Sequence, residues 1–463
     1  MQPELDLIIA GGTVVLSDCV AKLDIGIRNG TIQSLTPPMT YGNEITVIQA
    51  EGLHILPGTV DIHVHFNEPG LGSWEGFQTG SAALAAGGMT TYVDMPLNGV
   101  PPTVNAEHLA TKKIAAEYHS YVDYALWGGL VEGNVAQLEE LSVGGVVGFK
   151  AFMSEPGGEG EEIFTRADDD TLLAGMKEIA RLGHVLALHA EDESTVSTLA
   201  HQAIVQGKTG VRDYLDSRPI VAEVIAVQRA LDYSGQTGCA LHFVHISSRE
   251  AVDIITAAKQ EGLNVTVETC PHYLVLTDQD MENKGVLAKC APPLRSAEEQ
   301  SALWDAVSLG LIDIIASDHS PCPPEMKQST NFFEAWGGIS GAQSTLLLML
   351  EEGYHQRQIP LPAITNMLSK NPAQRLGLAQ SKGQIEIGLD ADLVLVDLNQ
   401  PDTLDKEDLY DKHRQSPYIG YSFSSTVQKT IVRGHIVYDQ SSGLTDTCVG
   451  QFIAYQTGGV IHG

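Results

Sequence analysis

The middle of this 463-residue chain alternates between short apolar runs and longer segments with helical periodicity. Eight runs are rich in aliphatic and aromatic residues, as buried strands are, and they span 60–65, 90–95, 121–127, 146–152, 185–189, 241–246, 265–269 and 312–317. Amphipathic helical patterns lie between them, for example at 172–182, 222–233 and 251–259. Eight strand–helix repeats predict an α/β fold, a (β/α)8 TIM-type barrel.

Both ends of the chain are rich in short β-type runs that are separated by turn residues, at 5–10, 24–28, 383–387, 392–396 and 431–437. Asn29 and Gly30 between alternating runs predict a tight hairpin. Two β-rich ends around a different middle predict a small β-sandwich domain built from both termini. We expect residues 1–54 and 379–463 to form this small domain and residues 55–378 to form the barrel.

The charge balance is strongly acidic, with 58 Asp and Glu against 27 Lys and Arg and a net charge of −31. Nucleic acids and anionic membranes need a basic surface, so neither is expected as a partner. The sequence has no apolar stretch of membrane-spanning length and no secretory leader pattern, which favours a cytoplasmic location. The six cysteines form no CxxC pair, and free thiols are expected.

Two histidines lie one residue apart in the first predicted barrel strand, at His63 and His65. Residues i and i+2 of a strand point to the same side, so both imidazoles could reach one metal ion. An isolated pair of this kind could equally be two incidental polar residues. Four further polar residues fall at or near the ends of other predicted strands, namely Lys150, His189, His245 and Asp318. Barrel active sites form at such strand ends, which favours a shared site.

Lys150 stands within an almost wholly apolar run at 146–153. A lone buried ammonium there would be costly, and nearby divalent cations would repel it. One interpretation is that Lys150 is a functional residue of the shared site. The alternative is that its stem reaches toward the surface and keeps the ammonium in water.

Two strand-borne histidines followed by Lys, His, His and Asp in this chain order resemble the ligand set of the amidohydrolase superfamily. The resemblance implies two divalent metal ions, one held by His63, His65 and Asp318 and the other by His189 and His245. It further implies that Lys150 is an N6-carboxylysine whose carbamate bridges both ions. Zinc is expected first, although manganese, cobalt and iron also suit histidine and carboxylate ligands. The implied mechanism uses a metal-bridging hydroxide as nucleophile and Asp318 as general base and then acid.

The loops resemble those of the allantoinases, within the cyclic-amide branch of that superfamily, over nearly the full chain. The matching segments are 63–70, 74–77, 79–81, 85–91, 94–98, 148–153 and 317–322. This resemblance implies hydrolysis of the cyclic amide of allantoin to allantoate, with a small-molecule substrate and assembly as a homo-oligomer, commonly a tetramer.

Two related activities are the alternatives. Dihydroorotases carry an arginine for the substrate carboxylate where this chain has Asn67, and an amide suits a neutral ureide ring. Hydantoinases and dihydropyrimidinases usually have a tyrosine after the carboxylated lysine, where this chain has Ser-Glu-Pro-Gly-Gly at 154–158. A non-catalytic relative that has lost ligands is disfavoured, because all six ligand positions carry a competent residue.

Five residues are candidates for substrate binding: Asn67, Asn98, Cys290, Ser320 and Gly337. For the two asparagines, a turn-forming role is the alternative. His319 adjoins Asp318 and is interpreted as structural. Residues 154–166, which follow the Lys150 strand and are rich in Gly and Glu, form either a mobile lid or a solvated loop.

Overall fold

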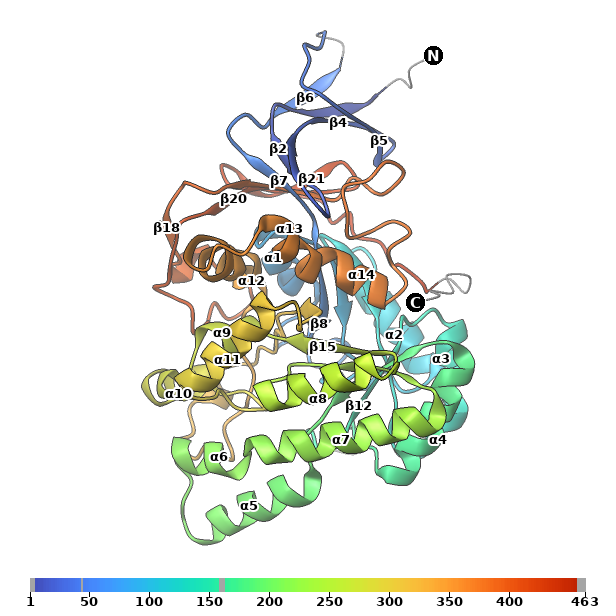
Figure 1. Ribbon diagram of the computed structural model, residues 1–463, viewed down its shortest axis with the longest axis vertical. Coiled ribbons are helices and arrows are strands. Elements are labelled where there is room, and N and C mark those ends of the chain that lie inside the picture. Colours follow the sequence, from blue (N-terminus) through green and yellow to red (C-terminus); the bar gives the residue numbers. More distant parts are fainter. Residues whose placement is uncertain (1–4, 43–44, 158–162, 456–463) are drawn as a thin grey trace.

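The computed structural model describes residues 5–42, 45–157 and 163–455, and it places a β-rich domain at one end of a larger barrel (Figure 1). Within the described residues, the barrel contains eight main parallel strands, each overlapping one of the predicted runs: β8 (Thr59–Val64), β9 (Met89–Asp94), β10 (Asp123–Leu126), β12 (Phe149–Phe152), β13 (Val185–His189), β14 (Ala240–Phe243), β15 (Val265–Thr269) and β16 (Ile314–Ile315). The prediction of a (β/α)8 barrel is confirmed.

Hydrogen bonds close these strands into a ring. β10 pairs with β9, and the short β11 (Gly128–Gly129) that follows it pairs with β12, so one stretch of chain joins the two halves of the barrel. The last gap lies between β16 and β8, where the His65 N–H donates to the His319 carbonyl oxygen at 2.8 Å. This closure brings the residues after β16 directly beside the two histidines of β8.

The barrel helices follow from capped, amphipathic sequence segments. α4 (Asp169–Leu182) begins at Asp168, whose side chain accepts the Thr171 N–H, and ends at the left-handed Gly183. Its buried face holds Leu172, Met176 and Ile179, among others, at helical spacing. The other barrel helices include α1 (Phe77–Ala86), α2 (Ala106–Ala116), α5 (Glu193–Val205), α6 (Val211–Ser217), α7 (Ile220–Thr237), α8 (Arg249–Gln260) and α11 (Ala297–Ser308).

The segments after the barrel strands are helical, but they are interrupted. α12 (Thr345–Leu348) continues as a π-helical turn over Met349–Gln356, and α13 (Leu361–Thr365) does so over Asn366–Lys370. Figure 1 shows α12, α13 and α14 (Asn371–Arg375) between the barrel and the β-rich domain.

The small domain is a sandwich of two sheets built from both ends of the chain. One sheet has the order β5-β4-β1-β6, and the other has the order β22-β21-β20-β17-β7-β2-β3. Their bounds are β1 (Leu7–Ala10), β2 (Thr13–Val15), β3 (Val20–Lys22), β4 (Asp24–Arg28), β5 (Thr31–Thr36), β6 (Thr46–Gln49), β7 (His54–Pro57), β17 (Leu393–Asp397), β20 (Thr426–Val432), β21 (His435–Asp439) and β22 (Gly443–Leu444). β7 and β17 pair antiparallel, and they unite the termini in one sheet.

Two local predictions for the small domain have opposite outcomes. The hairpin at Asn29 and Gly30 is confirmed, since both residues have positive φ (49° and 76°) between β4 and β5. The strand predicted at 383–387 is wrong, because this stretch is a loop with positive φ at Gly383 and Gly388. Ile385 is buried in the core of the sandwich, whereas Ile387 is 58% exposed. The alternating apolar pattern of this stretch therefore belongs to a loop with one buried side chain and not to a strand.

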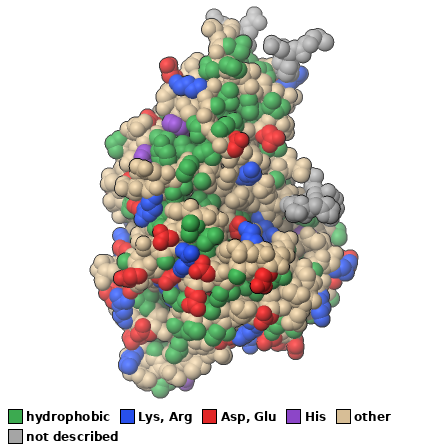
Figure 2. All heavy atoms as spheres, viewed as in Figure 1, with side chains coloured by type: hydrophobic (Ala, Val, Ile, Leu, Met, Phe, Trp, Pro, Cys, Tyr) green, Lys and Arg blue, Asp and Glu red, His purple; other side chains and the backbone are tan. Residues whose placement is uncertain are grey.

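The surface is mixed in charge where it can be seen. On the face drawn in Figure 2, acidic and basic side chains are interspersed over the barrel, and basic side chains do not gather there into one patch. None of the helices in the described part of the chain is long and apolar enough to cross a membrane.

A buried ion-pair network connects the barrel to the small domain. Lys382 Nζ lies 2.6 Å from Asp123 Oδ2, 2.7 Å from Asp392 Oδ2 and 2.9 Å from Asp390 Oδ2. Asp123 belongs to β10 and also pairs with Arg433 of the small domain. Burial disfavours the ammonium, but the carboxylates outweigh this effect and raise the pKa of Lys382 above its usual value.

Lys382→Met should therefore destabilise the protein, because it leaves three neighbouring carboxylates without their shared cation. Breaking a buried ion pair costs about 3–5 kcal/mol of unfolding free energy, so the melting temperature measured by circular dichroism should fall clearly. Arg181→Ala is the matched control, since it removes only exposed ion pairs with Glu178 and Glu139. Equal melting temperatures for the two variants would contradict the structural role of the network.

Candidate active site

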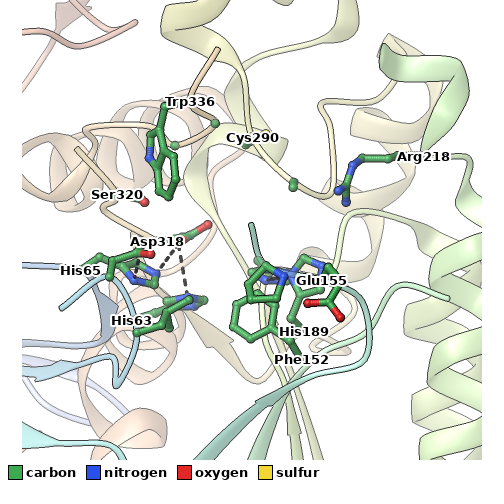
Figure 3. Close-up of a pocket in the computed structure, with 17 residues that line it drawn as sticks. His63, His65, Phe152, Glu155, His189, Arg218, Cys290, Asp318, Ser320 and Trp336 are labelled. Carbon is green, nitrogen blue, oxygen red and sulfur yellow. Dashed lines mark hydrogen bonds and ion pairs between the residues drawn. The ribbon is translucent and has the colours of Figure 1, made fainter. Parts of the chain in front are cut away.

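The six predicted ligand residues meet at the carboxyl end of the barrel strands. His63 is on β8 and His65 follows that strand, while Lys150 is on β12 and His189 ends β13. His245 and Asp318 follow β14 and β16 within three residues. Five of the six line one pocket, and Figure 3 shows Asp318 with His63 and His65 on one side of it and His189 on the other. Lys150 is fully buried and is not among the residues that line the pocket.

The first cluster of donors consists of His63, His65 and Asp318. Asp318 Oδ1 lies 3.2 Å from His63 Nε2 and 3.3 Å from His65 Nε2. One ligand atom of each residue falls within 4.8 Å of the other two, a separation that a single metal ion could span. The first cluster is therefore compact enough to hold one ion.

The proton arrangement at His63 tests whether a cation fits there. His63 Nδ1 lies 2.8 Å from Glu268 Oε1, so the neutral imidazole carries its hydrogen on Nδ1. Its Nε2 lone pair then faces the Asp318 carboxylate oxygen at 3.2 Å. Two lone pairs at this separation repel one another, and a metal ion between them removes the repulsion. The donor set thus fits a divalent cation.

Glu268 is the residue that orients this cluster. It accepts hydrogen bonds from His63, from His242 Nε2 at 3.0 Å and from the His245 backbone N–H at 3.1 Å. Burial alone would raise the pKa of Glu268, but the His63 and His242 imidazoles hold that pKa well below its usual range. An ionised carboxylate behind a metal-binding histidine is a recurrent supporting arrangement.

The second cluster consists of His189 and His245. His189 Nδ1 lies 2.9 Å from His245 Nε2, and His189 Nε2 lies 2.8 Å from Glu191 Oε2. Glu191 is in turn paired with Arg218. Because Glu191 holds the hydrogen of His189 on Nε2, the lone pair of His189 Nδ1 points toward His245 Nε2.

Lys150 is an unpaired buried amine near both clusters. It is fully buried, and its Nζ has no hydrogen-bond partner among the described residues. Burial lowers the pKa of Lys150 to about 7, although the Glu268 and Asp318 carboxylates act in the opposite direction. A buried amine of low pKa has a large neutral fraction at pH 7, and the neutral amine is the form that can add CO2. The site therefore fits the carbamate that the resemblance implies.

The backbone is strained at several site residues. His245 and Asp318 have φ of 41° and 46°, and Asn67 and Asn98 have φ of 65° and 58°. Non-glycine residues adopt this left-handed region infrequently, and such residues concentrate at functional sites. For the two asparagines, the positive φ agrees with the turn-forming alternative.

The structure brings four of the five substrate-binding candidates to the pocket wall, namely Asn98, Cys290, Ser320 and Gly337. Asn67 does not line the pocket. It is buried behind Asn98, and its side-chain amide donates to the Asn98 carbonyl oxygen at 3.4 Å. His319 Nδ1 accepts the N–H groups of Gly341 and Ala342, which agrees with a structural role for that residue.

Several pocket residues were not identified from the sequence, and they include Phe152, Glu155, Arg218 and Trp336. The Phe152 ring stacks on His189 at 4.7 Å between centroids, and Trp336 packs edge-on against Trp74. Glu155 and Pro156 belong to the segment predicted as a lid or a solvated loop. Residues 158–162 of that segment lie outside the described residues, so the choice between the two stays open.

Comparison with known proteins identifies the family. The amidohydrolase family is matched over residues 54–437. The chain is 49% identical to an allantoinase of Rubrobacter xylanophilus over 94% of each chain. It is also 49% identical to an allantoinase of Deinococcus radiodurans, over 97% of this chain and 98% of that protein.

Solved structures show the same fold. An L-hydantoinase (dihydropyrimidinase) from Arthrobacter aurescens superposes with a TM-score of 0.94 at 32% identity, covering 97% of this chain and all of that one. A D-hydantoinase (dihydropyrimidinase) from Thermus sp. has a TM-score of 0.90 at 27% identity, covering 97% of this chain and 99% of that one. With the family match and the near-full-length identity, these likenesses place the chain in the amidohydrolase family, among the allantoinases.

Proposed function

We propose that this protein hydrolyses the cyclic amide bond of allantoin and releases allantoate. The observation that carries the hydrolytic part is the unpaired buried amine of Lys150 close to two converging sets of donor atoms. The choice of substrate is supported by the relatives that are named allantoinase. We further propose a cytoplasmic location and a homo-oligomeric assembly, with a tetramer as the expected form.

Two divalent cations complete the proposed site. His63, His65 and Asp318 would hold one, His189 and His245 would hold the other, and the carboxylated Lys150 would be shared by both. Zinc is the first expectation, and manganese, cobalt or iron also suit these ligands. When bound, the cations supply an activated water and polarise the carbonyl that is attacked.

The side chains of the protein orient the histidine ligands and transfer the proton. Glu268 and Glu191 fix the ring orientations of His63 and His189, so the donor atoms stay directed at the pocket. Asp318 faces the pocket, and its Oδ1 lies close to His63 Nε2 and His65 Nε2. As an ionised carboxylate it can take the proton of the attacking water and return it to the leaving amide nitrogen.

The polar groups of the pocket wall are proposed to hold the substrate ring. Asn98, Ser320, Cys290 and Gly337 would contact the ring, and Asn67 would act through Asn98. Ring amides present both donors and acceptors, which the amide, hydroxyl and backbone groups of these residues can satisfy.

A substrate panel tests the proposal. The purified protein, supplemented with a divalent metal, is assayed with allantoin, dihydroorotate, dihydrouracil and hydantoin. We expect the highest kcat/KM for allantoin. Preferential turnover of hydantoin or dihydrouracil would instead indicate the activity named for the structural neighbours, and preference for dihydroorotate would contradict both interpretations.

A further inference from the structure

Arg218 and Glu155 line the pocket on the side away from Trp336 and Ser320 (Figure 3). Arg218 follows α6, and Glu155 follows β12 by three residues. Neither residue belongs to the proposed ligand set, yet both share the pocket with His63 and Asp318. Together they place a hydrogen-bond donor and an acceptor on the same side of the pocket.

The guanidinium of Arg218 is held in place and has donors to spare. The guanidinium NH1 pairs with Glu191, and the backbone carbonyl oxygen of Arg218 accepts from Arg295 NH1 at 2.6 Å. Its Nε and NH2 make no hydrogen bond to any described residue. The Arg218 side chain is 20% exposed, whereas the Glu191 side chain is 1% exposed. The unused N–H groups therefore have access to the pocket.

Glu155 offers the complementary acceptor. Its backbone N–H donates to Glu193 Oε2 at 2.9 Å, which anchors the residue. Its Oε1 lies 3.0 Å from Arg166 Nε, but both side chains are well exposed, so this pair contributes little. A carboxylate has about four acceptor positions, and one neighbour leaves most of them available.

The charges on this wall favour a neutral ligand group. Glu191 already neutralises Arg218, and an anionic group would be repelled by Glu155. A neutral group that accepts at one edge and donates at the other fits better, and a ureido group is of this kind. Its carbonyl oxygen accepts, and its terminal NH2 donates.

We propose that Arg218 and Glu155 form a subsite for the ureido group that allantoin carries outside its ring, an inference that rests on the proposed function. Arg218 donates to the ureido carbonyl oxygen, and Glu155 accepts from the terminal NH2. In allantoin this group is attached to the ring carbon next to the carbonyl that is attacked. The subsite therefore selects a ureido-substituted ring and orients that carbonyl toward Asp318.

The test compares allantoin with hydantoin, which has the same ring without the ureido group. Arg218→Lys keeps a cation for Glu191 but loses the fork of donors, and Glu155→Ala removes the acceptor. Hydrogen bonds to charged groups are worth about a 10- to 100-fold change, so kcat/KM for allantoin should fall by that factor in each variant. For hydantoin we expect a change within about twofold in Glu155→Ala. In Arg218→Lys, which also contacts Glu191, the loss for hydantoin should be clearly smaller than the loss for allantoin. Glu155→Gln keeps an acceptor oxygen and should recover part of the loss.

Arg166→Gln is the matched control, because it removes the ion-pair partner of Glu155 without removing a pocket residue. Its kcat/KM for allantoin should stay within about twofold of the wild type. Metal content is measured for every variant. If the wild type does not hydrolyse hydantoin, the Ki of hydantoin as a competitive inhibitor replaces kcat/KM.

The possible results distinguish a failure of the proposed subsite from a failure of the proposed function. Equal losses for both substrates in Arg218→Lys would mean that Arg218 acts only through Glu191 and His189, and they would overturn the subsite alone. Unchanged allantoin kinetics in Glu155→Ala would do the same. A wild-type enzyme that hydrolyses hydantoin but not allantoin would overturn the proposed function, and the subsite with it.

Discussion

Lys150→Ala should lose nearly all activity and much of the bound metal. Groups that merely support metal ligands are worth about 10- to 100-fold, and a residue shared by both proposed ions should cost at least the upper end of that range. The structural reason is that Lys150 Nζ is fully buried without a hydrogen-bond partner among the described residues, where an ammonium would be costly and a carbamate could serve as a shared ligand. The measurements are kcat/KM and metal content by elemental analysis.

Chemical rescue makes the Lys150 prediction specific. Short carboxylic acids should partly restore Lys150→Ala, because the alanine leaves space where a carboxylate can bind. Lys150→Met fills that space and should not respond to the same acids, which controls for general effects of the acid. An intact mass that shows unmodified Lys150 in active, metal-loaded enzyme under CO2 would contradict the bridging role.

Asp318→Asn should separate proton transfer from metal binding. Asparagine keeps the size and one coordinating oxygen, but its amide cannot accept a proton at neutral pH. We expect most of the metal to remain while kcat falls by at least the ~10²-fold that is typical for loss of a general base.

A histidine variant provides the contrast for Asp318→Asn. His65→Ala removes a proposed ligand that has no part in proton transfer, so metal content and activity should fall together. Wild-type kcat in fully metal-loaded Asp318→Asn would remove Asp318 from the proton-transfer role.

The barrel and the gathering of the ligand residues were predictable for a physical reason. Strand periodicity is a local signal, and a closed parallel barrel brings every carboxyl strand end to one rim. His63, Lys150 and Asp318 could therefore be grouped without knowledge of any contact between them. The roles of these residues stay predictions until they are tested.

The partners of the ligand residues could not be predicted in the same way. Glu268 contacts His63 across 205 positions of sequence, and no local pattern encodes that pairing. Its only signal was an acidic residue inside an apolar strand, the same kind of anomaly that identified Lys150. For Asn67, by contrast, the local sequence pattern was misleading. Strand alternation points it to the side of His63 and His65, but the chain leaves β8 before it, and a left-handed turn at Asn67 redirects the side chain.

The pairing of β7 with β17 has a consequence for biosynthesis. These neighbouring strands lie on opposite sides of the whole barrel sequence, so their contact is among the most distant that the chain makes. During translation, β7 emerges early. The edge of β7 that pairs with β17 stays unpaired until residue 397 has left the ribosome. Such an edge can pair with other chains. Premature termination before β17 would leave that edge permanently open, so truncated products of this protein should aggregate even when their barrel sequence is largely complete.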